Sequence, residues 1–157
     1  MTASDFKHTM KALNDFGDFI ITNYKSQLEA EKMNNGELYR NIKYSVSTGT
    51  GGWVISISLA DYWKYIEYGR RPGKMPPLEV IEKWIDVKEI KPHSMTLKSG
   101  KTVIPTPPKL PFLIARSIGR RGIAPKPLFK NSFEAAKKQF IQVIKDAITQ
   151  DIKESLV

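Results

Sequence analysis

The stretch IKYSVSTGTGGWVISISL, residues 42–59, decides the fold class. Ile42, Tyr44 and Val46 alternate with polar neighbours, and the same alternation returns in residues 53–59 after the glycine-rich segment TGTGG at 48–52. Two alternating runs joined by such a segment are typical of antiparallel strands with one buried face. We therefore predict a β-hairpin here.

Long amphipathic helices are predicted on both sides of the hairpin. From Ser4 to about Glu31, apolar residues recur at the spacing of a single helix face: Phe6, Met10, Leu13, Ile20, Tyr24 and Leu28. Residues 34–36, Asn-Asn-Gly, predict the end of this helix. A second stripe follows near the C-terminus: Phe133, Ala136, Phe140, Ile144, Ile148 and Ile152. We expect it to be buried against the first helix or the sheet.

Shorter elements are predicted between them: a helical turn at 61–68 ended by Gly69, a helix at 78–85, a small hairpin at 93–104, a proline-rich link at 105–111 and a helix at 112–118. The predicted fold class is α+β, a small antiparallel β-sheet packed by long N- and C-terminal α-helices. Basic loops at 69–77 and 93–111 should project. Residues 1–157 are expected to form a single domain, with a projecting loop or hairpin at about 88–111.

The net charge of +9 is concentrated in the middle of the chain. Between Lys64 and Lys126 there are 14 Lys and Arg residues against 5 Asp and Glu, whereas the rest of the chain has 11 of each. Such a concentration of positive charge attracts nucleic acid or an acidic protein surface. Composition predicts no membrane span, secretory signal or transit peptide, and the absence of cysteine excludes disulfides, thiolate catalysis and zinc–thiolate sites.

The sequence predicts no enzyme and no cofactor or metal site. His8 and His93 are far apart and lack metal-ligand spacing, so we interpret both as non-catalytic. Glu79, Glu82 and Asp86 share a predicted helix face, but lysines stand among them, which favours a charged surface. We found no nucleophile with a base and no acid–base pair.

The segment GRRG at 119–122 predicts a helix C-cap at Gly119 or Gly122, with two arginines near the carbonyl end of the helix. It lacks the context of a phosphate-binding loop. The dense aromatic group Tyr62, Trp63, Tyr65 and Tyr68 favours a buried or interface role over a base-stacking surface.

Two segments resemble a known family. The first is YWKYIEYG at 62–69, which follows a strand, and the second is ARSIGRRGIAPKPLF at 115–129, which precedes the last helix. In this order, over about residues 42–150, they resemble the tail-completion, or head–tail joining, proteins of tailed bacteriophages. Trp63 stands where that family usually has Ala, Arg70 where it has Thr, and Leu128-Phe129 reverses its last pair.

The resemblance implies a non-enzymatic structural subunit of a head–tail connector ring in the virion neck, made in the host bacterial cytoplasm. Such a ring of six or twelve copies would join the portal or an adaptor protein to the tail tube or other neck proteins. It would leave a channel for the genome, with non-specific contact to DNA there, and would involve no membrane.

Two sets of residues follow from this interpretation. Those expected at subunit interfaces or facing DNA are Arg70, Arg71, Lys74, Arg120, Arg121 and Lys126. Those expected to be structural anchors are Tyr62, Tyr65, Glu67, Tyr68, Gly69, Pro125, Pro127 and Phe129. The alternative is a non-enzymatic nucleic-acid-binding protein that uses the basic 64–126 region.

Overall fold

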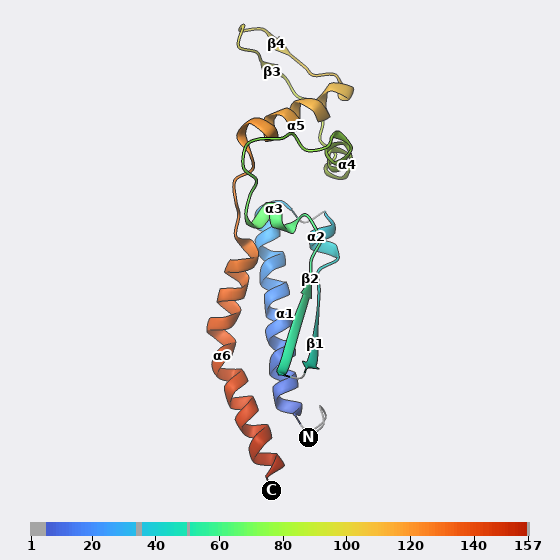
Figure 1. Cartoon of the computed structure of the whole chain (residues 1–157). Helices are drawn as coiled ribbons and strands as arrows, with labels where there is room; N and C mark the ends of the chain where they lie inside the picture. The colour runs from blue at the N-terminus through green and yellow to red at the C-terminus, as the bar shows by residue number, and fades with distance from the viewer. Residues whose placement is uncertain (1–5, 34–35, 50, 157) are drawn as a thin grey trace. The chain divides into compact units, whose positions relative to one another are not determined.

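A computed structural model describes residues 6–33, 36–49 and 51–156 (Figure 1). The contacts divide the chain into two compact units. The terminal unit comprises Met1–Trp63 and Pro127–Val157, and the middle unit comprises Lys64–Lys126. These bounds coincide with the window of excess charge, so the middle unit carries the entire net charge of the chain. The expectation of a single domain stays a prediction.

Helix α1, Lys7–Ala30, forms the centre of the terminal unit. Its buried residues follow the predicted stripe closely: Thr9, Ala12, Leu13, Gly17, Ile20, Tyr24 and Leu28. Glu31 is the C-cap of the helix, and Lys32 then adopts a positive φ of 57°. The predicted start at Ser4 and the predicted stop at Asn34 and Asn35 lie outside the described residues.

Helix α6, Leu128–Ser155, packs antiparallel to α1, as Figure 1 shows. Near the start of α6, Gln27 Nε2 donates to Ser132 Oγ at 2.6 Å, and farther along, the Phe140 ring lies 5.4 Å from that of Phe19. The prediction that α6 packs against the first helix is confirmed. The stripe is only partly buried, however, since Phe133 and Ile152 remain exposed.

Strands β1, Lys43–Gly49, and β2, Gly52–Ser58, pair antiparallel, with Tyr44 opposite Ile57 and Val46 opposite Ile55. The predicted hairpin is confirmed, although Thr50 of its turn lies outside the described residues. The Tyr44 ring lies directly on Gly17 of α1, where a Cβ would stand 2.5 Å from the ring. The missing side chain therefore lets the sheet approach the helix closely.

Two short helices complete the terminal unit's connections. Helix α2, Glu37–Arg40, buries Leu38, whose backbone N–H donates to the Tyr62 hydroxyl at 2.8 Å. Helix α3 spans Trp63–Glu67. Its first residue, Trp63, belongs to the terminal unit, and its other residues belong to the middle unit. Tyr62 thus ties the chain just before α3 to α2.

The middle unit contains the predicted short elements: helix α4, Leu78–Lys88; strands β3, Met95–Thr96, and β4, Thr102–Val103; the 3-10 turn η2, Pro107–Lys109; and helix α5, Leu110–Arg121. The strands pair antiparallel, which confirms the small hairpin. Helices α4 and α5 pack together and bury Ile81 and Ala115. The observed elements and the packed terminal helices confirm the α+β class.

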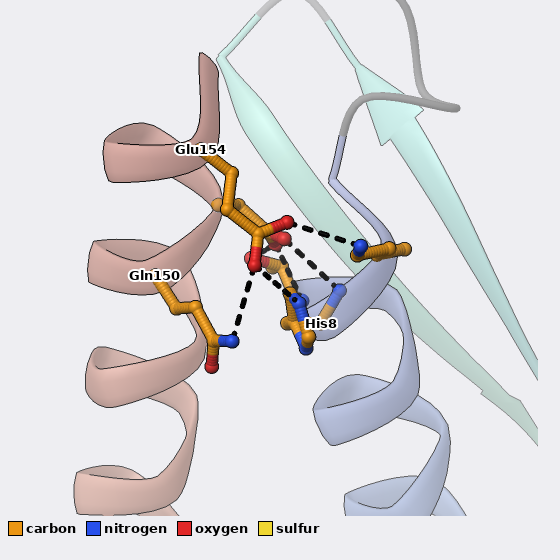
Figure 2. A network of polar contacts seen from close by, with 6 residues as sticks. His8, Gln150 and Glu154 are labelled. Carbon is orange, nitrogen blue, oxygen red and sulfur yellow. Dashed lines mark hydrogen bonds and ion pairs between the residues drawn. The ribbon is translucent and has the colours of Figure 1, made fainter. Parts of the chain in front are cut away.

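A carboxylate of α6 caps the start of α1 (Figure 2). Asp151, only 1% exposed, accepts hydrogen bonds from the backbone N–H of His8 at 3.1 Å and of Thr9 at 2.7 Å. It also accepts from the Thr9 hydroxyl at 2.6 Å. Helix α1 has no side-chain cap at its N-cap residue, so Asp151 satisfies donors that would otherwise lack partners.

The same end of the helix pair carries an exposed ionic contact. Glu154 lies 3.0 Å from Lys7 Nζ and 3.1 Å from His8 Nε2, and it also accepts from Gln150. The hydrogen bond from Lys7, with those from Gln150 and His8, holds the pKa of Glu154 below its usual value. Because these groups are exposed, the contact adds little to stability compared with the buried cap.

Replacing Asp151 with Ala should lower the free energy of unfolding by about 2 kcal/mol, because two backbone N–H groups and a buried hydroxyl lose their acceptor. Urea denaturation at neutral pH measures the change. Asp146 of α6, which is exposed and accepts only from Gln142 in the described contacts, provides the matched control D146A. Equal effects of the two substitutions would contradict the capping role.

The cap should also depend on pH. Burial raises the pKa of Asp151, but the hydrogen bonds from Thr9 and His8 outweigh it and hold the pKa below its usual value of 3.8. The stabilising contribution is therefore complete above that value and is lost as the pH falls through the lower folded pKa. The stability difference between wild type and D151N should stay constant above about pH 5 and shrink below about pH 4.

Candidate functional site

Two segments far apart in sequence are joined by backbone hydrogen bonds in the middle unit. Arg70 N–H donates to the Ile123 carbonyl at 2.9 Å, and Ile123 N–H donates to the Arg70 carbonyl at 2.8 Å. Gly73 N–H donates to the Gly119 carbonyl at 2.7 Å. We call this set of three bonds the backbone clamp. It fixes the loop after α3 to the end of α5.

Glycine is required at two positions of the clamp. Gly69 has φ of +69°, and a Cβ there would lie 2.4 Å from the Ile123 carbonyl oxygen. Gly122 has φ of +74°, and a Cβ there would lie 2.2 Å from the Arg70 carbonyl oxygen. Any other residue would combine an unfavourable backbone conformation with a clash against backbone atoms.

The structure also decides between the two predicted C-cap positions. Gly122 is the C-cap of α5, whereas Gly119 lies within the helix and is buried. A Cβ at Gly119 would stand 2.9 Å from Met75 Cγ and 3.2 Å from the Gly73 carbonyl oxygen. Gly119 therefore serves the close approach of the loop rather than the end of the helix.

The clamp brings together five of the six basic residues predicted at an interface. They are Arg70, Arg71, Lys74, Arg120 and Arg121, which we call the basic patch. All except Arg70, which is half-buried, are exposed. Within the described residues, none of the five forms an ion pair with a carboxylate.

Arg70 is held by two further contacts. Its Nη2 donates to the Lys74 carbonyl at 2.8 Å, and its guanidinium lies 6.0 Å from the centre of the Tyr65 ring. The first contact closes the loop on itself, and the second is a cation–π arrangement. Arg70, Arg71 and Lys74 of the patch are thus on a loop that has little freedom left to lose on binding.

Lys126, the sixth predicted basic residue, has a different position. Its backbone N–H donates to the Ile66 carbonyl of α3 at 2.7 Å, and the residue is half-buried. Its described backbone contact therefore connects the end of the middle unit to α3. The clamp itself does not include Lys126.

Most predicted anchors lie at structural contacts. Glu67 is buried, Pro125 lies against Gly69, and Pro127 is the N-cap residue of α6. The Phe129 ring packs 5.7 Å from Tyr24 and 5.9 Å from Trp63, within the terminal unit.

Of the buried or interface role predicted for the aromatic group, burial is wrong for Tyr65 and Tyr68. Their side chains are 53% and 73% exposed. Helix α3 has only five residues, so a single face can be covered, and the acidic Glu67 occupies the buried position instead of an aromatic ring. Aromatic density alone did not reveal which face of so short a helix packs inward.

One group of potential metal ligands occurs among the described residues: His8, Asp151 and Glu154, with ligand atoms within 4.8 Å of one another. Both Asp151 oxygens already accept hydrogen bonds, and Lys7 lies beside Glu154. These contacts fit a helix cap rather than a cation site. No local sequence signal singles out Asp151, because its partners His8 and Thr9 are at the other end of the chain.

An open pocket of about 290 Å³ lies in the terminal unit beside α2 and the end of β2. Its lining is Glu37, Asn41, Ser58, Leu59, Ala60 and Asp61. The lining offers two carboxylates but no histidine, lysine or arginine to pair with them.

Comparison with models of protein families, with curated proteins and with solved structures gives no match to the chain. Among the described helices, none combines the length and apolar character needed to cross a bilayer. The clamp and the basic patch are therefore the structural features of the chain that bear on its function.

Replacing Gly122 with Ala should open the backbone clamp, because the new Cβ would clash with the Arg70 carbonyl oxygen. Hydrogen exchange at the Arg70 and Ile123 amides should become at least about tenfold faster, as expected for a local loss of more than 1 kcal/mol. Gly100, with φ of +79° and nothing near its Cβ position, gives the control G100A. Unchanged protection in G122A would show that the glycine is not needed for the clamp.

Proposed function

We propose that the chain is a non-enzymatic assembly subunit that forms a ring in the neck of a tailed bacteriophage virion. The ring would join the portal or an adaptor protein to the tail tube or other neck proteins, and the genome would pass through its channel. The observation that carries the proposal is the basic patch, held by the backbone clamp with none of its charges paired within the described residues. A rigid, unpaired charged surface suits docking.

The apolar surface of the middle unit supports the same proposal. This unit of 63 residues exposes many large hydrophobic side chains: Tyr65, Tyr68, Leu78, Val80, Trp84, Val87, Met95, Leu97, Ile104, Phe112 and Ile123. A surface with so many exposed apolar side chains is one that a partner would cover. A subunit with two neighbours in a ring would cover such surfaces on both sides.

The proposed function predicts that the purified chain forms rings. Light scattering at low ionic strength should give a mass of about six or twelve times 17.9 kDa, and negatively stained particles should show a central opening. Nucleic acid must be removed beforehand, because it could bring basic chains together by itself. A chain that remains monomeric at its highest soluble concentration would contradict the ring proposal.

A second candidate is a nucleic-acid-binding protein, and the exposure of Tyr65 and Tyr68 favours it. The two rings lie in the segment just before Arg70, and Arg70 is stacked near Tyr65. Exposed aromatic rings beside arginines form sequence-tolerant surfaces for single-stranded nucleic acid. This candidate needs the basic patch to face phosphate rather than protein.

If the second candidate is right, replacing Tyr65 and Tyr68 with Ala should weaken binding of single-stranded DNA by about tenfold or more, since each stacked base contributes about 1–3 kcal/mol. Fluorescence anisotropy at several salt concentrations measures the affinity. Phe112, exposed near the start of α5, gives the aromatic control F112A. If wild type and Y65A/Y68A bind single-stranded DNA with equal affinity, the two rings do not stack on bases and no longer favour the second candidate.

A further inference from the structure

The hairpin of β1 and β2 has two free edges. Within the described residues, β1 pairs only with β2, and no backbone hydrogen bond joins either strand to another segment. In an antiparallel pair, every second residue of each strand directs its N–H and C=O groups away from the partner strand. Each edge therefore presents a row of backbone donors and acceptors to any strand that comes beside it.

The features that usually block strand addition are scarce on both edges. Soluble proteins protect such edges with lysines, prolines, bulges or very short strands. Here both strands have seven residues, contain no proline and pair without a bulge from Lys43–Ser58 to Gly49–Gly52. Strand β2 has no charged residue, and β1 has only Lys43, at its first position. The hairpin is thus open to extension on both sides.

The two faces of the hairpin differ in chemistry. One face packs on α1, where the Tyr44 ring lies on Gly17 and the Trp53 ring lies 5.8 Å from that of Phe6. The side chains of the opposite face are exposed and are mostly serines; we call this face, which comprises Lys43, Ser45, Ser47, Val54, Ser56 and Ser58, the serine face. It has no carboxylate, and its one charged residue is Lys43.

We propose that the hairpins of neighbouring copies pair edge to edge and close into a β-barrel whose serine face lines the channel of the ring. Strand β2 of each copy would pair antiparallel with β1 of the next copy. This inference rests on the proposed function, because it identifies the contact that joins neighbouring subunits and the surface past which the genome would move.

A second copy of the hairpin suits these edges better than a strand of another protein. Rotation about a ring axis keeps the direction of each strand along that axis, so β2 and the neighbouring β1 meet antiparallel without any rearrangement. A single foreign strand would cover one edge and leave the other open. A closed ring of hairpins covers both edges of every copy, which is how β-barrels remove edges.

The width of the barrel decides the number of copies. Neighbouring strands lie about 4.8 Å apart and tilt by about 40° in barrels, so each strand occupies about 6.3 Å of the circumference. Each copy contributes two strands, so six copies form a barrel about 24 Å wide between backbones and twelve copies form one about 48 Å wide. Once the inward side chains are subtracted, the smaller barrel is narrower than a DNA duplex. The channel therefore requires twelve copies.

The same width decides which face points inward. Helices α1 and α6 have 24 and 28 residues, and twelve such pairs would leave no channel inside a barrel about 48 Å wide. The face that packs on α1 therefore points outward, and the serine face points inward. Because serine hydroxyls carry no charge, this lining neither holds phosphates as a basic surface does nor repels them as an acidic one does. It suits the passage of DNA.

Disulfide cross-linking tests the contact directly, because the chain has no cysteine of its own. The β1 variant S45C is produced together with V54C, S56C or S58C of β2, one mixture at a time. Residues that face each other across antiparallel strands have Cα atoms about 4.5–5.5 Å apart, which a disulfide can bridge. The three β2 positions cover register shifts of two residues in either direction.

At least one mixture should give about tenfold more cross-linked dimer under mild oxidation than either of its variants alone. The single variants serve as controls, because a cyclic ring never places two β1 strands or two β2 strands side by side. Light scattering of the wild-type ring should give about twelve times the mass of the chain, 17.9 kDa.

Lysines added to the edge strand provide a second measurement. The variant V54K/S56K places two positive charges on the serine face of β2, and lysine on an edge strand opposes strand addition. Self-association measured by sedimentation velocity should weaken by about tenfold or more. T22K/S26K, at two exposed positions of α1, adds the same charge and should associate like wild type. Circular dichroism establishes that both variants are folded.

The outcomes separate this inference from the proposed function. If wild type forms rings but no mixture cross-links, or V54K/S56K assembles normally, the hairpin is not the contact and the ring function stands. A ring of six copies also overturns the barrel, because it would be too narrow for a duplex. If S56C alone cross-links as strongly as the mixtures, two β2 strands pair about a two-fold axis and the barrel is overturned. If wild type stays monomeric, both proposals are overturned.

Discussion

The antiparallel bridge between Arg70 and Ile123 is the constraint on which the basic patch depends. It joins a loop that would otherwise extend from α3 to the end of a helix about fifty residues later, and it exists only because Gly69 and Gly122 have no side chains. The arginines on both segments are therefore presented together. Since the backbone is already fixed by hydrogen bonds, docking would lose little further conformational entropy.

In the terminal unit, a different long-range contact joins two segments that are far apart in the sequence. Asp151, near the end of α6, caps the first turn of α1, and the aromatic contacts between Phe16, Phe19 and Phe140 continue the helix pair. The cap ties the last turns of the final helix to the first turns of the first helix. The hairpin then packs on α1 through Tyr44 and Gly17, so a single helix organises the whole unit.

The two units differ in how many large side chains they bury and in their net charge. The terminal unit contains most of the large buried side chains, such as Ile20, Tyr24 and Leu28, and its formal charge is balanced. The middle unit has few buried hydrophobic residues but carries the net charge and most of the exposed apolar ones.

The sequence by itself determined the long helices, both hairpins and the basic character of residues 64–126, because helix and strand periods and net charge are local properties of the chain. The local sequence also predicted that a glycine of GRRG caps a helix and that Gly69 ends the helical turn before it. Only the tertiary structure decided that Gly69 lies against Ile123 and Gly122 against Arg70, that Asp151 caps α1 and that Glu67 rather than Tyr65 or Tyr68 is buried. Each of these depends on which distant backbone or side chain comes close, and a single sequence contains no record of that distance.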